Sequence, residues 1–186
     1  MGLETAIGSV LAAFGLSSAA GLNAWLPLFA SALLARLDVV ELAAPFDQPS
    51  STAGLVVLAG LMTADFVGDK IPVVDHVLHL VGTAVAPASG AILFTGQTGL
   101  ETELPTLAAV LLGALTAGSV HAGRAAVRPV ATATTGGVGN PVLSLGEDLG
   151  SLALVAAAFV LPLLAVVLVL ALAVSFVSLR RRIRRR

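Results

Sequence analysis

The sequence predicts an all-α protein, a polytopic transmembrane helix bundle of five to seven crossings in which some helices are interrupted or re-entrant. Of its 186 residues, 57 % are hydrophobic and only 11 % are charged, whereas a soluble domain is about one quarter charged. The mean hydropathy is +1.00. Several stretches approach the roughly 20 apolar residues that cross a bilayer as a helix. Glycine, proline and charged residues separate these stretches.

The apolar segments give the expected helices in chain order. Their apolar residues encircle each helix, as is typical of helices embedded in lipid. Small residues recur four apart at Gly113 and Ala117, a spacing that lets membrane helices approach closely. The first two segments are short, so they could form either one crossing or two. The last segment is interpreted as one crossing. The segments cover residues 5–20, 24–37, 54–67, 79–94, 105–122 and 151–179.

The C-terminal end carries most of the positive charge. Six of the ten basic residues lie in residues 180–186, which we interpret as a tail behind a single transmembrane domain at residues 1–179. Because arginine and lysine flanking a span stay inside, we expect a multi-pass protein of the cell membrane with a cytoplasmic C-terminus. The tail could also bind anionic lipid headgroups.

The loops differ in charge. Residues 38–48 and 97–103 are acidic and contain no lysine or arginine, so we expect them outside. Arg124 and the tail then share a side, and the chain between them must cross an even number of times. Because residues 151–179 supply one crossing, residues 130–150 become a broken or re-entrant segment that is shielded from lipid. An ordinary surface loop with a weaker charge bias is the open alternative.

Composition excludes several functions. The chain has no cysteine, which rules out disulfides, thiolate metal sites and cysteine nucleophiles. Outside the tail, four basic residues stand against eleven acidic ones, so nucleic acid is not an expected partner. No Walker loop, paired-histidine zinc signature or Gly-x-Ser-x-Gly elbow is present.

Residues 64–79, "ADFVGDKIPVVDHVLH", concentrate ionisable groups. Asp65 and Asp69 are four apart and share a helical face. Pro72 disfavours a helix at the residue before it and suits the start of a new helix. The segment therefore predicts a helix, a break and a second helix. The candidate metal ligands on it are Asp65, Asp69, Asp75, His76 and His79.

These side chains need a reason to lie in a membrane protein. A charge at the bilayer centre costs about 2.5–3.5 kcal/mol on insertion scales. Oxygen and imidazole ligands suit a divalent cation, the one candidate cofactor, and imidazole with carboxylate also suits a proton relay. The alternative is a solvated connection in which Asp69 and Lys70 form an exposed pair.

A second cluster, "HAGRAAVRP", places His121, Arg124 and Arg128 on one helical face. The arginines could neutralise the acids of residues 64–79 or bind an anion such as phosphate. Interfacial anchoring of the span is the alternative.

A third cluster is "TTGGVGNPVLSLGED". Asn140 is the expected N-cap of a helix and Pro141 its first residue, and a helix N-terminus within a membrane can face a substrate. Glu147, a further candidate metal ligand, and Asp148 follow two turns later. "GLNAWLPL" repeats the pairing of glycine, asparagine and proline around Asn23. The expected ion path comprises Asn23, Lys70, His121, Arg124, Arg128, Asn140 and Asp148.

Four ordered motifs carry a family resemblance over nearly the whole chain: "GLNAWLPL", "DKIPVVDH", "AVRPVATATTGGVGNP" and "LSLGED". They resemble the bacterial polytopic membrane family called domain of unknown function 4126. This resemblance implies a membrane protein and no particular activity. A shorter likeness, at Asp65, Gly68, Asp69 and Lys70, is to the Glu-x-Gly-Asp-Lys/Arg-Ser/Thr motif of calcium/manganese–proton exchangers. Here the spacing is one residue longer and Ile71 replaces the hydroxyl.

We expect the protein to be a transporter or channel for an inorganic ion. The clustered acids favour a cation as that ion, and its transport could be coupled to protons. The acids and histidines would be ligands or proton carriers, and the arginines would be counter-charges. A short chain makes a homo-oligomer plausible. Two alternatives stay open: a metal-dependent enzyme acting on lipid headgroups, with Asp65 and Asp69 holding Mg²⁺, and a non-catalytic structural or partner-binding protein.

Overall fold

The computed structural model describes residues 3–68, 71–99 and 102–184, and their regular structure is entirely helical. This confirms the all-α class. Four of the described helices, α1, α4, α5 and α6, are long and apolar enough to cross a membrane, so the chain is a membrane protein built from transmembrane helices. The helices are α1 (Leu3–Leu22), α2 (Trp25–Arg36), α3 (Thr52–Gly68), α4 (Pro72–Thr98), α5 (Thr106–Thr135), α6 (Asn140–Val160) and α7 (Pro162–Arg184).

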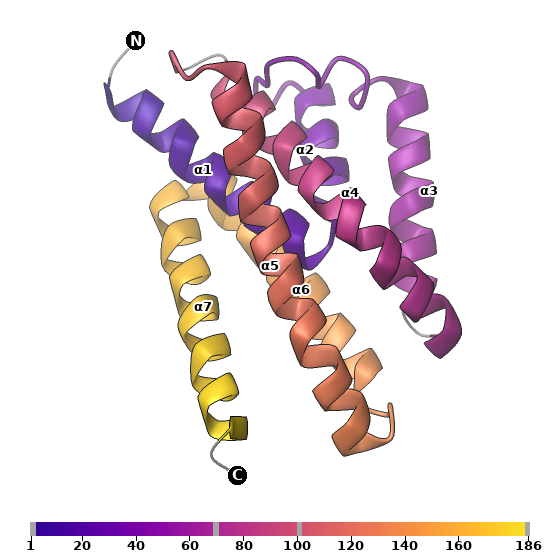
Figure 1. Ribbon diagram of the computed structural model, residues 1–186. Helices are drawn as coiled ribbons and strands as arrows, with labels where there is room; N and C mark the ends of the chain where they lie inside the picture. The colour runs from indigo at the N-terminus through magenta and orange to yellow at the C-terminus, as the bar shows by residue number, and fades with distance from the viewer. Residues whose placement is uncertain (1–2, 69–70, 100–101, 185–186) are drawn as a thin grey trace.

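Successive helices run back and forth between two ends of the bundle (Figure 1). The two acidic connections, between α2 and α3 and between α4 and α5, lie at the same end as the start of α1. The turn between α5 and α6 and the end of α7 lie at the opposite end. The acidic loops therefore share one end of the bundle, and the basic tail follows from the other.

The centre of the bundle is where α1, α4 and α5 cross. A Cβ on Gly90 of α4 would overlap the carbonyl oxygen of Gly113 on α5, and a Cβ on Gly113 would overlap that of Gly90. A Cβ on Gly21 of α1 would likewise lie 2.6 Å from the carbonyl oxygen of Ala117. Hence the small residues of α5 let three backbones touch, as their spacing predicts.

The interpretation of residues 151–179 as one crossing is wrong. α6 ends at Val160 and α7 starts at Pro162 and runs back along the bundle (Figure 1). Proline has no amide hydrogen and disfavours helical geometry in the residue before it, and Leu161 has φ −145° and ψ 83°. Two antiparallel helices, α6 and α7, therefore lie between Arg124 and the tail, as the even-crossing argument requires.

Residues 130–150 also differ from both predicted forms. α5 continues to Thr135 and ends at Gly136, whose left-handed φ of 62° suits glycine. α6 begins at Asn140, with Gly139 as its N-cap, one residue earlier than predicted. The segment is thus a tight helical hairpin and not a re-entrant or extended loop.

The predicted break between Gly68 and Pro72 is confirmed, and so is a second break after Leu22. α2 has 12 residues, which span about 18 Å, less than the roughly 30 Å hydrocarbon core. α2 is therefore a half-length helix. The break between α1 and α2 lies between the two ends of the bundle (Figure 1).

Candidate functional site

Asn23 occupies the break between α1 and α2 and is 3 % exposed. Its side-chain oxygen accepts hydrogen bonds from the backbone amides of Trp25 (3.1 Å) and Leu26 (3.0 Å). These amides start α2 and have no partner within the helix, so Asn23 caps it. Its amide nitrogen donates to Asp148 Oδ1 at 2.8 Å and to Asp65 Oδ2 at 3.3 Å. One buried amide therefore joins α2 to carboxylates from α6 and α3.

The interrupted end of α1 is satisfied by side chains from other helices. Arg124 of α5 donates to the carbonyl oxygen of Leu22 at 2.7 Å, and the hydroxyl of Ser151 on α6 donates to that of Ala19 at 3.0 Å. The last carbonyls of a helix, such as that of Leu22, lack partners within it, and lipid offers none. The Ala19 carbonyl also accepts the backbone amide of Asn23 at 2.9 Å. These contacts allow α1 to end inside the bundle.

Glu147 lies between two arginines. Its Oε2 is 2.7 Å from Nε of Arg124 and 2.6 Å from Nη2 of Arg128. All three side chains are largely buried, and a buried charge is tolerated when it is paired and hydrogen-bonded. Glu147 thus neutralises much of the positive charge that α5 carries into the bundle.

Two histidines stack beside this ion pair. The rings of His79 on α4 and His121 on α5 have centroids 4.9 Å apart and an interplanar angle of 28°. A Cβ on Gly82 would lie 2.8 Å from Cε1 of His121, so only glycine leaves room for this ring.

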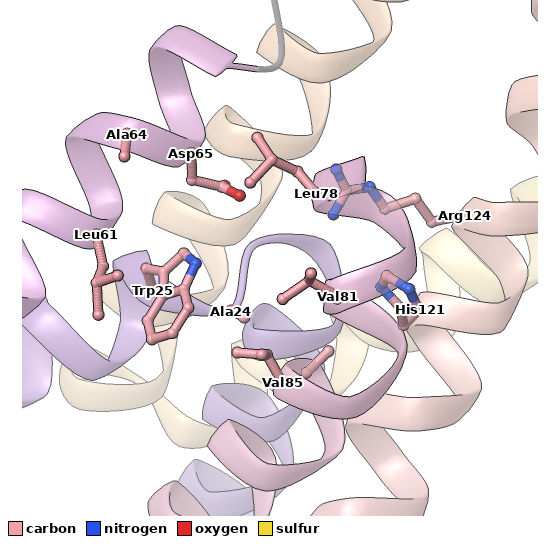
Figure 2. Close-up of a pocket in the computed structure, with 12 residues that line it drawn as sticks. Ala24, Trp25, Leu61, Ala64, Asp65, Leu78, Val81, Val85, His121 and Arg124 are labelled. Atoms are coloured by element: carbon pink, nitrogen blue, oxygen red, sulfur yellow. The ribbon is translucent and has the colours of Figure 1, made fainter. Parts of the chain in front are cut away.

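A cavity of about 150 Å³ adjoins Asn23 and lies among α2, α3, α4 and α5. Its polar lining comes from Trp25, Asp65, His121 and Arg124, and the other lining residues are alanine, glycine, valine and leucine. Figure 2 shows the Asp65 carboxylate and the Arg124 guanidinium pointing toward one another, with the Trp25 indole below them. The cavity is therefore mainly apolar with a few charged or aromatic groups, as ligand sites are.

Charged groups of both signs surround the break in the part of the chain that the structure describes. The described network contains three carboxylates, on Asp65, Glu147 and Asp148, and two guanidinium groups, on Arg124 and Arg128. With neutral histidines the formal charge of these five groups is −1.

The structure brings together most of the candidate residues. Asn140 lies elsewhere: it exchanges hydrogen bonds with Thr132 at the α5–α6 turn, at 3.0 and 3.2 Å. Asp69 and Lys70 lie outside the described residues, as do the side chains of Asp75 and His76. The residues gathered around the break, the ion pair and the cavity are Asn23, Asp65, His79, His121, Arg124, Arg128, Glu147 and Asp148.

The predicted ligand roles stay predictions, and one observed contact concerns them directly. Glu147, a candidate metal ligand, pairs with both arginines, whose predicted partners were the acids of residues 64–79 or an anion. Among the described residues, no group of three or more His, Asp or Glu is placed to hold a metal ion. The described side chains thus supply negative charge without a three-ligand metal centre.

The sequence analysis did not identify three residues that shape this site. Trp25 lines the cavity, Gly82 makes space for His121, and Ser151 satisfies α1. Trp25 is the chain's single tryptophan and directly follows the predicted interruption, which was a usable signal. Gly82 and Ser151 sit in apolar runs, and nothing local distinguishes them.

The chain matches no curated protein and no solved structure. A family model described as "Domain of unknown function (DUF4126)" matches residues 10–182, which include every residue of the site. The resemblance of the four motifs is thereby confirmed, and the chain belongs to the DUF4126 family.

Proposed function

We propose that this chain is a small transporter or channel for an inorganic cation, with its site at the break between α1 and α2. One observation carries the proposal: the buried amide of Asn23 is shared by the carboxylates of Asp65 and Asp148, beside a cavity. Ionisable groups within membrane helices are costly and commonly mark ion pathways.

The arrangement supports cation entry in two ways. Asp65 and Asp148 attract positive charge, while Glu147 offsets the arginines that would repel it. The bond from Asn23 to Asp148 is 2.8 Å and that to Asp65 is 3.3 Å. Asp65, and not Asp148, lines the cavity, so it is the carboxylate that an incoming ion meets first.

The orientation belongs to the same proposal. With the C-terminal tail in the cytoplasm, the acidic connections face outward and raise the local concentration of cations. The arginines of the tail then lie against the anionic inner leaflet. A homo-oligomer in the cell membrane would enlarge this small bundle, and proton coupling would use the His79–His121 pair.

The rival functions draw less support from the contacts. A lipid-headgroup enzyme needs cationic side chains for phosphate, and both arginines are engaged by Glu147. A purely structural role would leave cation flux at the level of empty vesicles, so one assay separates it from transport.

The test is cation flux into liposomes that contain the purified chain. Asp65→Asn removes one charge at nearly constant volume and should lower the flux about tenfold or more, because a charge-assisted contact is lost. Asp38→Asn is the matched control: Asp38 is exposed in an acidic loop and has φ 54°, which asparagine also adopts. Absence of flux for every common inorganic cation, with or without Asp65, would contradict the proposal.

A further inference from the structure

We propose that the cavity beside Asn23 binds a small monovalent cation that carries N–H donors, namely ammonium or methylammonium. This inference rests on the proposed function and names its substrate class. It stands on three neighbouring groups that line the cavity: the imidazole of His121, the carboxylate of Asp65 and the indole of Trp25 (Figure 2).

His121 points to a ligand. The residue is 4 % exposed, and neither ring nitrogen has a partner of good hydrogen-bond geometry among the described residues; only the backbone of His79 approaches the ring. Buried polar atoms nearly always have partners, and a neutral imidazole has one nitrogen that accepts and one that donates. If the His79 backbone takes the ring N–H, the second nitrogen is left as an acceptor, and because the ring lines the cavity, the cavity is where its donor would lie.

The His121 ring is also held in place. It stacks on His79 and abuts Gly82, so it has little freedom to turn toward another partner. A fixed acceptor at the wall of a small cavity selects a donor, and an ammonium ion offers only donors.

The other two groups match the same ion. Asp65 supplies a charged acceptor, and the face of a tryptophan attracts cations of the ammonium type. Sodium and magnesium prefer a shell of several oxygen ligands, whereas imidazole nitrogen and an indole face suit N–H donors. The lining therefore favours ammonium over a metal ion of equal charge.

The positive charge at the cavity wall is already paired. Arg124 also lines the cavity, but it is bound to Glu147 and to the carbonyl of Leu22. Its positive charge is therefore already paired with a carboxylate, so it does not exclude a cation from the cavity.

The experiment records charge movement in proteoliposomes on a solid-supported membrane, since neutral ammonia crosses lipid unaided and carries no current. Pulses of ammonium, methylammonium, potassium, sodium and tetramethylammonium chloride are compared. Ammonium and methylammonium should give currents about tenfold above potassium, which is similar in size and has no N–H, as expected for a charge-assisted hydrogen bond. Tetramethylammonium, which keeps the charge without N–H, should give none.

His121→Phe keeps a ring against His79 and removes both nitrogens, so the ammonium current should fall about tenfold. Thr116→Val, which removes a partly exposed hydroxyl that donates to the Leu112 carbonyl of the same helix, should leave it unchanged. The comparison of ions on the unaltered chain needs no variant and holds even where His121→Phe does not fold.

The outcomes separate this inference from the proposed function. Potassium, sodium or proton currents that equal or exceed the ammonium current would overturn the ammonium assignment and leave cation transport standing. An ammonium current that survives His121→Phe would overturn the assigned site. Absence of current for every cation would overturn both proposals.

Discussion

Two interruptions that look alike in the sequence have different surroundings in the structure. Residues 21–28 and 137–143 each contain glycine, then asparagine, then proline. Asn23 is 3 % exposed and binds α2, Asp65 and Asp148. Asn140 is partly exposed and binds Thr132 on the neighbouring turn.

The lengths of the flanking helices explain this difference. α5 has 30 residues, about 45 Å, and exceeds the roughly 30 Å hydrocarbon core, so the turn at its end extends toward water. α2 has 12 residues and covers only part of that thickness. The same short pattern thus makes a surface turn after a long helix and a buried polar site before a half-length one.

The largest expected effect comes from Glu147→Gln, which tests whether the arginines belong to the buried break. It leaves two largely buried guanidinium groups without their carboxylate, and breaking such a pair costs about 3–5 kcal/mol. Thermal unfolding in detergent measures the loss. Glu103→Gln, at an exposed position, is the control, and equal midpoints for the two variants would place Glu147 among ordinary surface charges.

Asn23→Ala should have the second-largest effect on stability. It removes the cap of α2 and the donor shared by Asp65 and Asp148, at a combined cost of about 2–4 kcal/mol. The same unfolding assay applies.

Asn23→Asp separates the two roles of this side chain. It keeps the capping oxygen and places a third carboxylate beside two others, so it should destabilise at least as much as alanine. Stability close to that of the original chain would mean that the cap alone matters.

Asn140→Ala should have the smallest effect. It loses the hydrogen bonds with Thr132 at a solvated turn, and the expected cost is about 0.5–1.5 kcal/mol. Val138→Ala, in the same turn and 80 % exposed, should change nothing measurable. If Asn140→Ala matched Asn23→Ala, the contrast between the two interruptions would disappear.

The sequence predicts the helices and their breaks well because hydrophobic length and proline act locally. The break before Pro72 and the shared end of the two acidic loops are examples. The prediction is wrong at Leu161, where a single proline divides a uniformly apolar segment into two antiparallel helices. The sequence also leaves the partner of Arg124 undecided, since Glu147 meets Arg124 across the α5–α6 hairpin, which was not predicted.

The path of the chain has a practical consequence for topology. α1 begins at the end with the acidic connections and α7 finishes at the other (Figure 1). Reporter domains fused to the N-terminus and to the C-terminus should therefore lie in different compartments. A reporter that fluoresces only in the cytosol should work at one end of the chain. A reporter that is active only on the other side of the membrane should work at the opposite end.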